Sequence, residues 1–238
     1  MKRYFIANWK MYLSISKSEQ LARQLVRLEK QKKLPANVEF IVAPSFLALP
    51  AVLAVFKKAK SKIKVAAQDV GIADEGAYTG GVSPRELKQM GVSYALVGHS
   101  ERREHWGEIG ALLAKKAALA ASSGLHVIYC VGETKDERHA ARAQSVVKSQ
   151  LREIKSEIAL VAYEPRWAIG TGIAIEPSEA EHMHAFIARE TKTVPVCYGG
   201  SVSEKNIGAF LAIDHTVGVL VGSASTSLSS LIAMFKRL

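Results

Sequence analysis

Short apolar runs alternate with helical patterns along the whole chain. The runs are nearly continuous in apolar residues rather than alternating with polar ones, which is typical of parallel strands covered on both faces. Between them, apolar positions recur with helical spacing, most clearly at Leu21, Leu25 and Leu28. The pattern predicts strands over Tyr4–Asn8, Val38–Ala43, Ile63–Gln68, Tyr94–Gly98, His126–Val131, Ile158–Tyr163, Val194–Tyr198 and Val217–Val221.

Two helix starts carry recognisable signals. Ser16 followed by Glu19 predicts a capping box for the helix that contains Leu21. Pro177 suits the first turn of the helix after the sixth predicted strand.

The spacing of the predicted strands indicates the architecture. Strand starts recur roughly every 30 residues, the length of one βα unit. Eight such units favour a closed α/β fold, a single-domain (β/α)8 barrel with parallel strands over residues 1–238, since no linker or low-complexity segment interrupts them. The alternative is an open, doubly wound sheet. It would need a glycine-rich fingerprint after the first strand, where Asn8-Trp9-Lys10-Met11 stands instead.

Composition adds limits to this picture. The formal net charge is +10, and residues 1–64 alone hold 14 Lys or Arg against 3 Asp or Glu. We interpret this excess as solvated helix faces rather than a nucleic-acid site, because no reading helix is recognisable and the lysine clusters at 30–33 and 57–64 contain no aromatic residue. No apolar run is long enough to span a membrane, and the N-terminal segment meets a polar residue too soon for a signal peptide. We therefore expect a soluble, cytoplasmic protein whose two cysteines, Cys130 and Cys197, are buried free thiols.

In a (β/α)8 barrel the chemistry lies at the carboxyl ends of the strands. Phosphate-binding barrels build their site after strands seven and eight, where glycine lets backbone N–H groups approach the ligand. Here those positions hold Gly199-Gly200-Ser201 and Gly222-Ser223, and a further glycine-bearing loop, which contains Gly170, follows strand six. This arrangement predicts a phosphate site. The remaining polar residues at strand ends are Asn8, Lys10, Gln68, His99, Glu101, Glu133 and Glu164.

Three of these residues suggest acid–base chemistry. Glu164 ends a very apolar strand, so it is either a poised general base or a salt-bridged structural carboxylate. His99 precedes a predicted helix start, which disfavours its charged form, so it is either a neutral hydrogen-bond donor or a satisfied buried histidine. Lys10 lies two residues after Asn8 and points to the same side. Together they suggest proton abstraction beside a carbonyl of a small phosphorylated substrate.

No metal site is expected. The seven histidines have no carboxylates at ligand spacing, and His182 and His184 are two residues apart in a helical stretch, so they point in different directions.

Six motifs stand at or near the ends of the predicted strands. They are Asn8-Trp9-Lys10, Gly98-His99-Ser100-Glu101-Arg102-Arg103, Cys130-Val131-Gly132-Glu133, Tyr163-Glu164-Pro165, Trp167-Ala168-Ile169-Gly170-Thr171-Gly172 and Tyr198-Gly199-Gly200-Ser201. Together they resemble one family, triosephosphate isomerase, over essentially the entire chain. The resemblance is highly specific, because the segments occur in the family's order and spacing.

The resemblance implies a cofactor-free isomerase that interconverts dihydroxyacetone phosphate and glyceraldehyde 3-phosphate. It implies that Glu164 moves the proton between carbons and that neutral His99 moves protons between oxygens. Lys10 and Asn8 would stabilise the enediolate, with Glu101 supporting Lys10. Phosphate binding would fall to Gly170, Ser201, Gly222 and Ser223, under a lid that starts at Pro165 and extends to about Ile175.

The resemblance also implies a homodimer. The segment from Asp69 to Gly81 is long for a βα connection and resembles the loop that family members insert into a partner subunit. Four features depart from the family pattern: Arg166 and Ile173-Ala174-Ile175 in the lid, Gly81 in the dimer loop, and Ser223 in the last phosphate loop.

Two other function classes stay open at this point. The four departures are compatible with a catalytically weak relative that binds a phosphorylated ligand. The basic N-terminal quarter is compatible with a surface for RNA or an anionic membrane.

Overall fold

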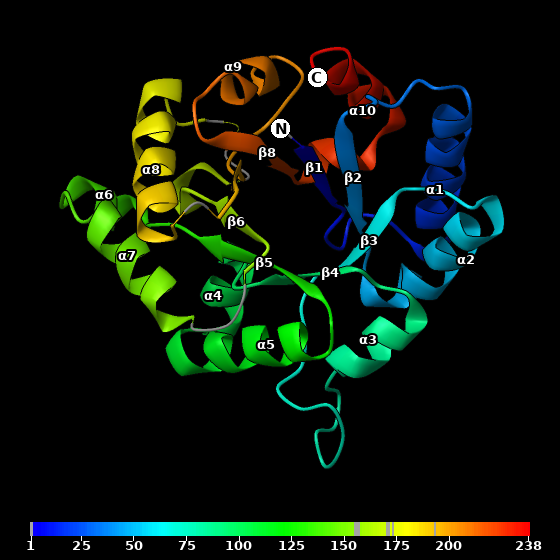
Figure 1. Cartoon of the computed structure of the whole chain (residues 1–238), viewed down its shortest axis with the longest axis horizontal. Helices are drawn as coiled ribbons and strands as arrows, with labels where there is room; N and C mark the ends of the chain where they lie inside the picture. The colour runs from blue at the N-terminus through cyan, green and yellow to red at the C-terminus, as the bar shows by residue number, and fades with distance from the viewer. Residues whose placement is uncertain (1, 155–157, 170–171, 173, 193) are drawn as a thin grey trace.

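The computed structural model describes all residues except 1, 155–157, 170–171, 173 and 193. Within the described residues, the strands pair in parallel and in chain order, and β1 closes onto β8 (Figure 1). This confirms the predicted single-domain (β/α)8 barrel and excludes the open sheet. The strands are β1 Arg3–Asn8, β2 Val38–Ala43, β3 Lys64–Ala67, β4 Tyr94–Val97, β5 His126–Val131, β6 Leu160–Tyr163, β7 Val196–Tyr198 and β8 Thr216–Val221.

Helices surround the strands on the outside (Figure 1). The α-helices of the described residues are α1 Ile15–Lys30, α2 Leu49–Ala59, α3 Pro84–Met90, α4 Ser100–Trp106, α5 Gly110–Ser122, α6 Lys135–His139, α7 Ala143–Glu153, α8 Pro177–Glu190, α9 Ile207–Leu211 and α10 Leu228–Phe235. Short 3₁₀ turns are η1 Phe46–Ala48, η2 Arg166–Ala168 and η3 Ser223–Thr226. Among the described residues, no helix combines the length and hydropathy that a bilayer crossing requires.

Several predicted ends are wrong by one or two residues, and local chemistry explains two of them. β4 ends before Gly98, which adopts a left-handed φ of +77°. β7 starts after Pro195, which has no N–H to donate to a neighbouring strand. The strands β2 and β5 have the predicted bounds.

The predicted capping box at Ser16 is also wrong. Helix α1 starts at Ile15, and the hydroxyl of Ser14 accepts the hydrogen bond from the Lys17 N–H. Ser14 has the extended backbone of a capping residue, whereas Ser16 already lies inside the first turn. The helix at Pro177 starts as predicted, with that proline in its first turn.

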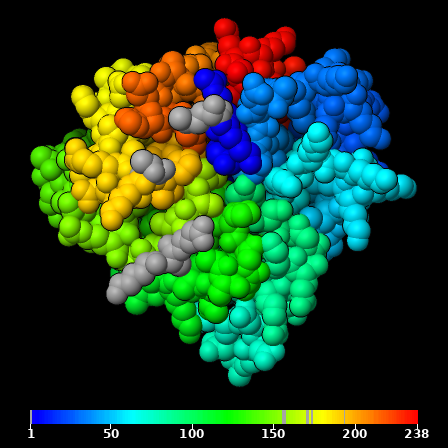
Figure 2. Space-filling view, in the orientation of Figure 1, coloured from blue at the N-terminus to red at the C-terminus, as the bar shows by residue number. Residues whose placement is uncertain are grey.

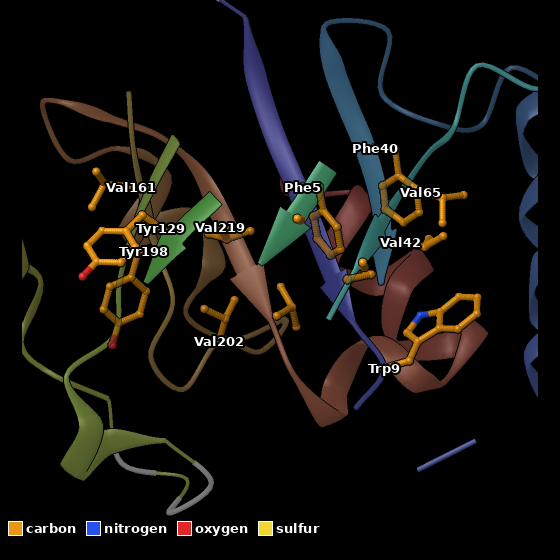
Figure 3. Close-up of a cluster of buried hydrophobic side chains, with 14 of the residues drawn as sticks. Phe5, Trp9, Phe40, Val42, Val65, Tyr129, Val161, Tyr198, Val202 and Val219 are labelled. Atoms are coloured by element: carbon orange, nitrogen blue, oxygen red, sulfur yellow. The ribbon is translucent and has the colours of Figure 1, made fainter. Parts of the chain in front are cut away.

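Two apolar layers hold the barrel together, and alternate residues of each strand supply them. Ile6 and Ile41 point into the barrel, where they form one buried cluster with Cys130 and Cys197. Phe5 points outward to the helices, and its ring stacks on Phe40 with 5.1 Å between centroids (Figure 3). Burial raises the pKa of both free thiols, which confirms the interpretation of the cysteines as inert core residues.

His184 on α8 is a buried histidine in the outer layer. Its Nδ1 lies 2.6 Å from the Thr216 hydroxyl, and its ring meets those of Tyr163 and Tyr198. Burial lowers the pKa of His184 to about 3. The folded protein therefore keeps this imidazole neutral at pH values where an unfolded chain would protonate it.

We expect this histidine to make stability depend on pH. Between its ordinary pKa of 6.5 and about 3, the unfolded chain binds one more proton than the folded one. The free energy of unfolding therefore falls as the pH drops, by about 2 kcal/mol between pH 7 and 5. Urea unfolding at both pH values should show this loss in the unmodified protein and in the control His139→Gln, at an exposed position. An equal loss in His184→Gln would contradict the assignment.

Candidate active site

Asn8 and Lys10 lie together at the carboxyl end of β1, as predicted. The Asn8 side chain is buried, and its Oδ1 accepts a hydrogen bond of 3.1 Å from the backbone N–H of Lys10. Lys10 adopts a left-handed backbone with φ of +49°, which costs a non-glycine residue about 1–2 kcal/mol. The surrounding contacts therefore hold Lys10 in one specific direction.

Glu101 is the partner of the Lys10 ammonium. Lys10 Nζ lies 2.5 Å from Glu101 Oε1. Burial opposes ionisation of this carboxyl, but the hydrogen bond from Lys10 and the positive charges nearby outweigh it and hold the pKa of Glu101 below its ordinary value. The pair stays charged at neutral pH, so the site has a fixed, oriented cation.

The hydrogen bonding of His99 fixes which nitrogen carries its proton. His99 caps α4, and its Nδ1 accepts a hydrogen bond of 3.2 Å from the backbone N–H of Glu101. A nitrogen that accepts such a bond has a free lone pair, so the proton of the neutral ring is on Nε2. His99 Nε2 lies 3.5 Å from Glu164 Oε1. The ring therefore places its Nε2 beside the Glu164 carboxylate, and the neutral state of His99 stays a prediction.

Glu164 follows β6 and is almost entirely buried, with 1% of its surface exposed. Its Oε2 accepts a hydrogen bond of 2.9 Å from the backbone N–H of Ser100. Its Oε1 is buried and has no hydrogen-bond partner among the described residues. No Lys or Arg pairs with this carboxylate among the described residues, so the only salt bridge open to it there is with a protonated His99.

Two glycines make room for Glu164. A Cβ added to Gly199 would lie 2.9 Å from Glu164 Cγ, and one added to Gly132 would lie 1.7 Å from the Glu164 carbonyl oxygen. From the sequence, Gly199 is expected in the phosphate site and Gly132 has no predicted role. Both contacts cross between neighbouring strands, so only the folded chain reveals them.

The described residues of the predicted phosphate site, Ser201, Gly222 and Ser223, follow β7 and β8 at the same end of the barrel. A Cβ on Gly222 would lie 3.3 Å from Lys10 Cε, so this loop passes directly beside the lysine. The hydroxyl of Ser201 donates a hydrogen bond of 2.6 Å to the carbonyl of Ala168, at the start of the predicted lid. Ser223 is exposed and begins η3. Gly170 lies outside the described residues.

Glu133, for which the sequence predicts no role, anchors the start of the predicted lid segment. Its carboxylate is fully buried and accepts hydrogen bonds from the hydroxyl of Tyr163 and from the indole N–H of Trp167. Arg138 Nη1 lies 2.9 Å from the same carboxylate. A buried carboxylate after an apolar strand was the available signal, but the sequence does not show its partners.

Arg166 stands between these anchors. Its backbone N–H donates to the carbonyl of Glu133, and its side-chain Nε is buried with no hydrogen-bond partner among the described residues. A buried guanidinium nitrogen without an acceptor costs free energy.

As for metals, no group of three or more potential ligands occurs in the part of the chain that the structure describes.

The fold is a (β/α)8 barrel in which a buried carboxylate, an imidazole and a paired lysine meet at the carboxyl ends of the strands, and such groups suit acid–base chemistry. The family model for triosephosphate isomerase matches residues 3–238. The chain belongs to the triosephosphate isomerase family.

Curated relatives agree over almost their full length. The triosephosphate isomerase of Psychrobacter sp. is 38% identical, and the alignment covers 99% of this chain and 98% of the relative. The enzyme of the same name from Chloroflexus aurantiacus is 39% identical over 94% of both chains. That of Thermodesulfovibrio yellowstonii is 37% identical, again over 94% of both chains.

The packing around Glu164 leads to a test of Gly199. We expect Gly199→Ala to destabilise the protein by about 1–3 kcal/mol, because the new methyl group must displace the Glu164 side chain. The matched control is Gly208→Ala in α9, where an added Cβ meets no atom within 4 Å. That change should be neutral or stabilising by up to about 1 kcal/mol. Urea unfolding measures both, and equal stability of the two variants would refute the packing argument.

Proposed function

We propose that this chain interconverts dihydroxyacetone phosphate and glyceraldehyde 3-phosphate, with the residues below in the stated roles. The observation that carries the proposal is the placement of the buried Glu164 carboxylate beside the N–H of His99, at the mouth that also holds Lys10. A base, a neutral acid and a fixed cation are what proton transfer next to a carbonyl requires.

Glu164 takes a proton from the carbon next to the substrate carbonyl and returns it to the former carbonyl carbon. Its free Oε1 is the atom suited to accept that proton. Between the two transfers the substrate is an enediolate. His99 Nε2–H donates a hydrogen bond to the carbonyl oxygen of the substrate and moves protons between the two substrate oxygens. A neutral imidazole can serve as the donor in these steps.

Lys10 and Asn8 stabilise the negative charge of the enediolate. The Lys10 ammonium is held by Glu101, so it is already oriented when charge develops on the substrate. Asn8 is buried directly beside the lysine backbone and adds an amide at the same end of β1. Glu101 acts through Lys10 and is a positioning residue in this scheme.

Phosphate binding falls to Gly170, Ser201, Gly222 and Ser223. Support comes from the contact of Gly222 with Lys10 and from the hydrogen bond between Ser201 and Ala168, which joins the loop after β7 to the lid segment. The lid from Pro165 to about Ile175 closes over the substrate and keeps water from the enediolate. At its far end, Ile175 is buried in the outer apolar layer.

The chemistry needs no cofactor or metal, because side chains carry every proton transfer. We assign it to one catalytic domain, residues 1–238, in the cytoplasm. The partners of this chain are a small phosphorylated triose and a second copy of the chain. We expect it to bind neither nucleic acid nor membranes.

The second copy is supported by exposed apolar side chains near the site. Met11 and Tyr12 directly follow Lys10 and are 88% and 61% exposed. The segment of residues 69–81 projects from the molecule at the bottom of Figures 1 and 2, and its base is joined by a hydrogen bond from Gly71 N–H to the Val82 carbonyl. A projecting loop and an exposed apolar patch suit a homodimer contact.

Glu164→Gln tests the proposed base. The amide keeps the shape of the side chain but cannot accept the proton, so kcat should fall by at least about 10²-fold while binding of phosphoglycolate is largely retained. A coupled assay and calorimetry measure the two quantities, and Glu181→Gln, at an exposed position on α8, is the control. A Glu164→Gln variant with more than half of the normal turnover would exclude Glu164 as the base.

Arg166→Val tests the lid. A guanidinium with a buried, unpartnered nitrogen is better hydrated when the lid is open, so the arginine should favour the open state. Phosphoglycolate requires the closed state, and its affinity should rise about tenfold in Arg166→Val if one hydrogen bond separates the states. Equal affinities would mean that Arg166 has no effect on the lid, and weaker binding would mean that it favours closure.

Sedimentation tests the dimer. We expect a dimer at micromolar concentration that is weaker than those of the relatives, because Gly81 offers no side chain to the partner. In the loop itself a Cβ at Gly81 would lie 2.9 Å from the Tyr78 carbonyl oxygen, so glycine is required by this turn. Monomer alone at tens of micromolar would rule the dimer out.

A further inference from the structure

Gln68 connects three strand ends beneath the proposed site. It follows β3 directly, and its side-chain Nε2 donates two hydrogen bonds, one to the carbonyl of Lys10 and one to the carbonyl of Ala43, both of 2.9 Å. Ala43 is the last residue of β2, and its carbonyl also accepts the backbone N–H of Trp9 at 3.0 Å. One amide group therefore joins the carboxyl ends of β1, β2 and β3.

The hydrogen bond from Gln68 to the Lys10 carbonyl reaches the residue of the site whose backbone is strained. Lys10 has a left-handed backbone, and its own N–H is held by Asn8 Oδ1. Its carbonyl is held by Gln68. A backbone in a sparsely populated conformation persists only when its surroundings determine it, and here two side chains fix the peptide groups on both sides of Lys10 Cα. Without Gln68, one of these two constraints is lost.

Both donor positions of the Gln68 amide are used in these bonds, so neither is left for the substrate. We infer that Gln68 is a positioning residue for the isomerisation: it holds the Lys10 backbone so that the ammonium stays between Glu101 and the substrate. This inference rests on the proposed function, because the role of Lys10 does.

The alternative is that Gln68 only strengthens the barrel. If Gln68 only strengthens the barrel, its substitution would change the free energy of unfolding and would not change substrate binding or turnover by the folded molecules. A positioning residue changes the site through Lys10, so its effect must depend on whether a lysine is present there. The two cases differ in a double-mutant cycle.

The test uses Gln68→Met, which keeps the length of the side chain and removes both donors. We expect kcat/KM per folded molecule to fall by about 10- to 100-fold, with part of the loss in kcat, because a small displacement of an orienting group has effects of this size. Gln68→Asn keeps the donors on a shorter side chain and should lose less. Gln89→Met, at an exposed position on α3, is the control and should match the unmodified protein.

The cycle adds two proteins, the single variant Lys10→Ala and the double variant that carries both Gln68→Met and Lys10→Ala. Calorimetry measures the affinity of each protein for phosphoglycolate. With Lys10 present, Gln68→Met should weaken binding by about tenfold; with alanine at position 10 it should change binding by less than about twofold. Equal losses in both backgrounds, or unchanged kcat/KM in both Gln68→Met and Gln68→Asn, would overturn the inference.

Hydrogen exchange of residues 8–13 separates this inference from the proposed function, since it requires no turnover. Exchange in this segment should be faster in Gln68→Met than in Gln89→Met, and an unchanged rate would overturn the inference even if the enzyme is active. Absence of turnover in the unmodified protein would overturn the proposed function and with it the role of Gln68 in isomerisation; the exchange result would then show only whether Gln68 holds the Lys10 backbone.

Discussion

Closure of the parallel barrel is the constraint on which the site depends. Since β1 pairs in parallel with both β2 and β8, every strand of the described structure has its carboxyl end at the same end of the molecule. This brings Lys10 and Glu101 to 2.5 Å although they are 91 positions apart in sequence. The outer apolar layer keeps the closed form together, because alternate strand residues such as Phe5 and Phe40 pack against the helices. The chemistry is local, but its geometry comes from the whole barrel.

The site contains two different carboxylates, one that pairs with a lysine and one that has no Lys or Arg partner among the described residues. Glu101 is partly exposed and neutralises Lys10, whereas Glu164 is buried with one oxygen unpartnered among the described residues. In the proposed mechanism the two carboxylates therefore have different tasks: Glu101 fixes a cation, and Glu164 accepts a proton. Glycine at position 199 leaves room for the Glu164 side chain, and glycine at position 132 leaves room for the Glu164 backbone.

Much of this arrangement could be predicted from the sequence, because parallel strands are continuous apolar runs and their ends carry the chemistry. Asn8, Lys10, His99 and Glu164 were found in that way. Helix starts were less certain, since Ser14 and Ser16 are both capping residue types and only the backbone conformation decides between them.

Contacts between strands could not be predicted at all. The clash that reserves Gly199 for Glu164 and the two bonds of Gln68 depend on neighbours that the sequence does not name. The lid is a similar case: Arg166 stands out in the sequence, but its unpartnered nitrogen is visible only in the fold. Pattern thus locates a site along the chain, and packing decides what each residue contacts.

The central claim is that a carboxylate base moves a proton between two carbons of a triose phosphate. Isomerisation of dihydroxyacetone phosphate in deuterium oxide, with the product examined by NMR, tests it most directly. A carboxylate can exchange the proton it carries with the solvent, so we expect turnover in which part of the product has deuterium on the carbon that receives the proton. No turnover, or proton transfer between the carbons that Glu164→Gln leaves unchanged, would contradict the claim.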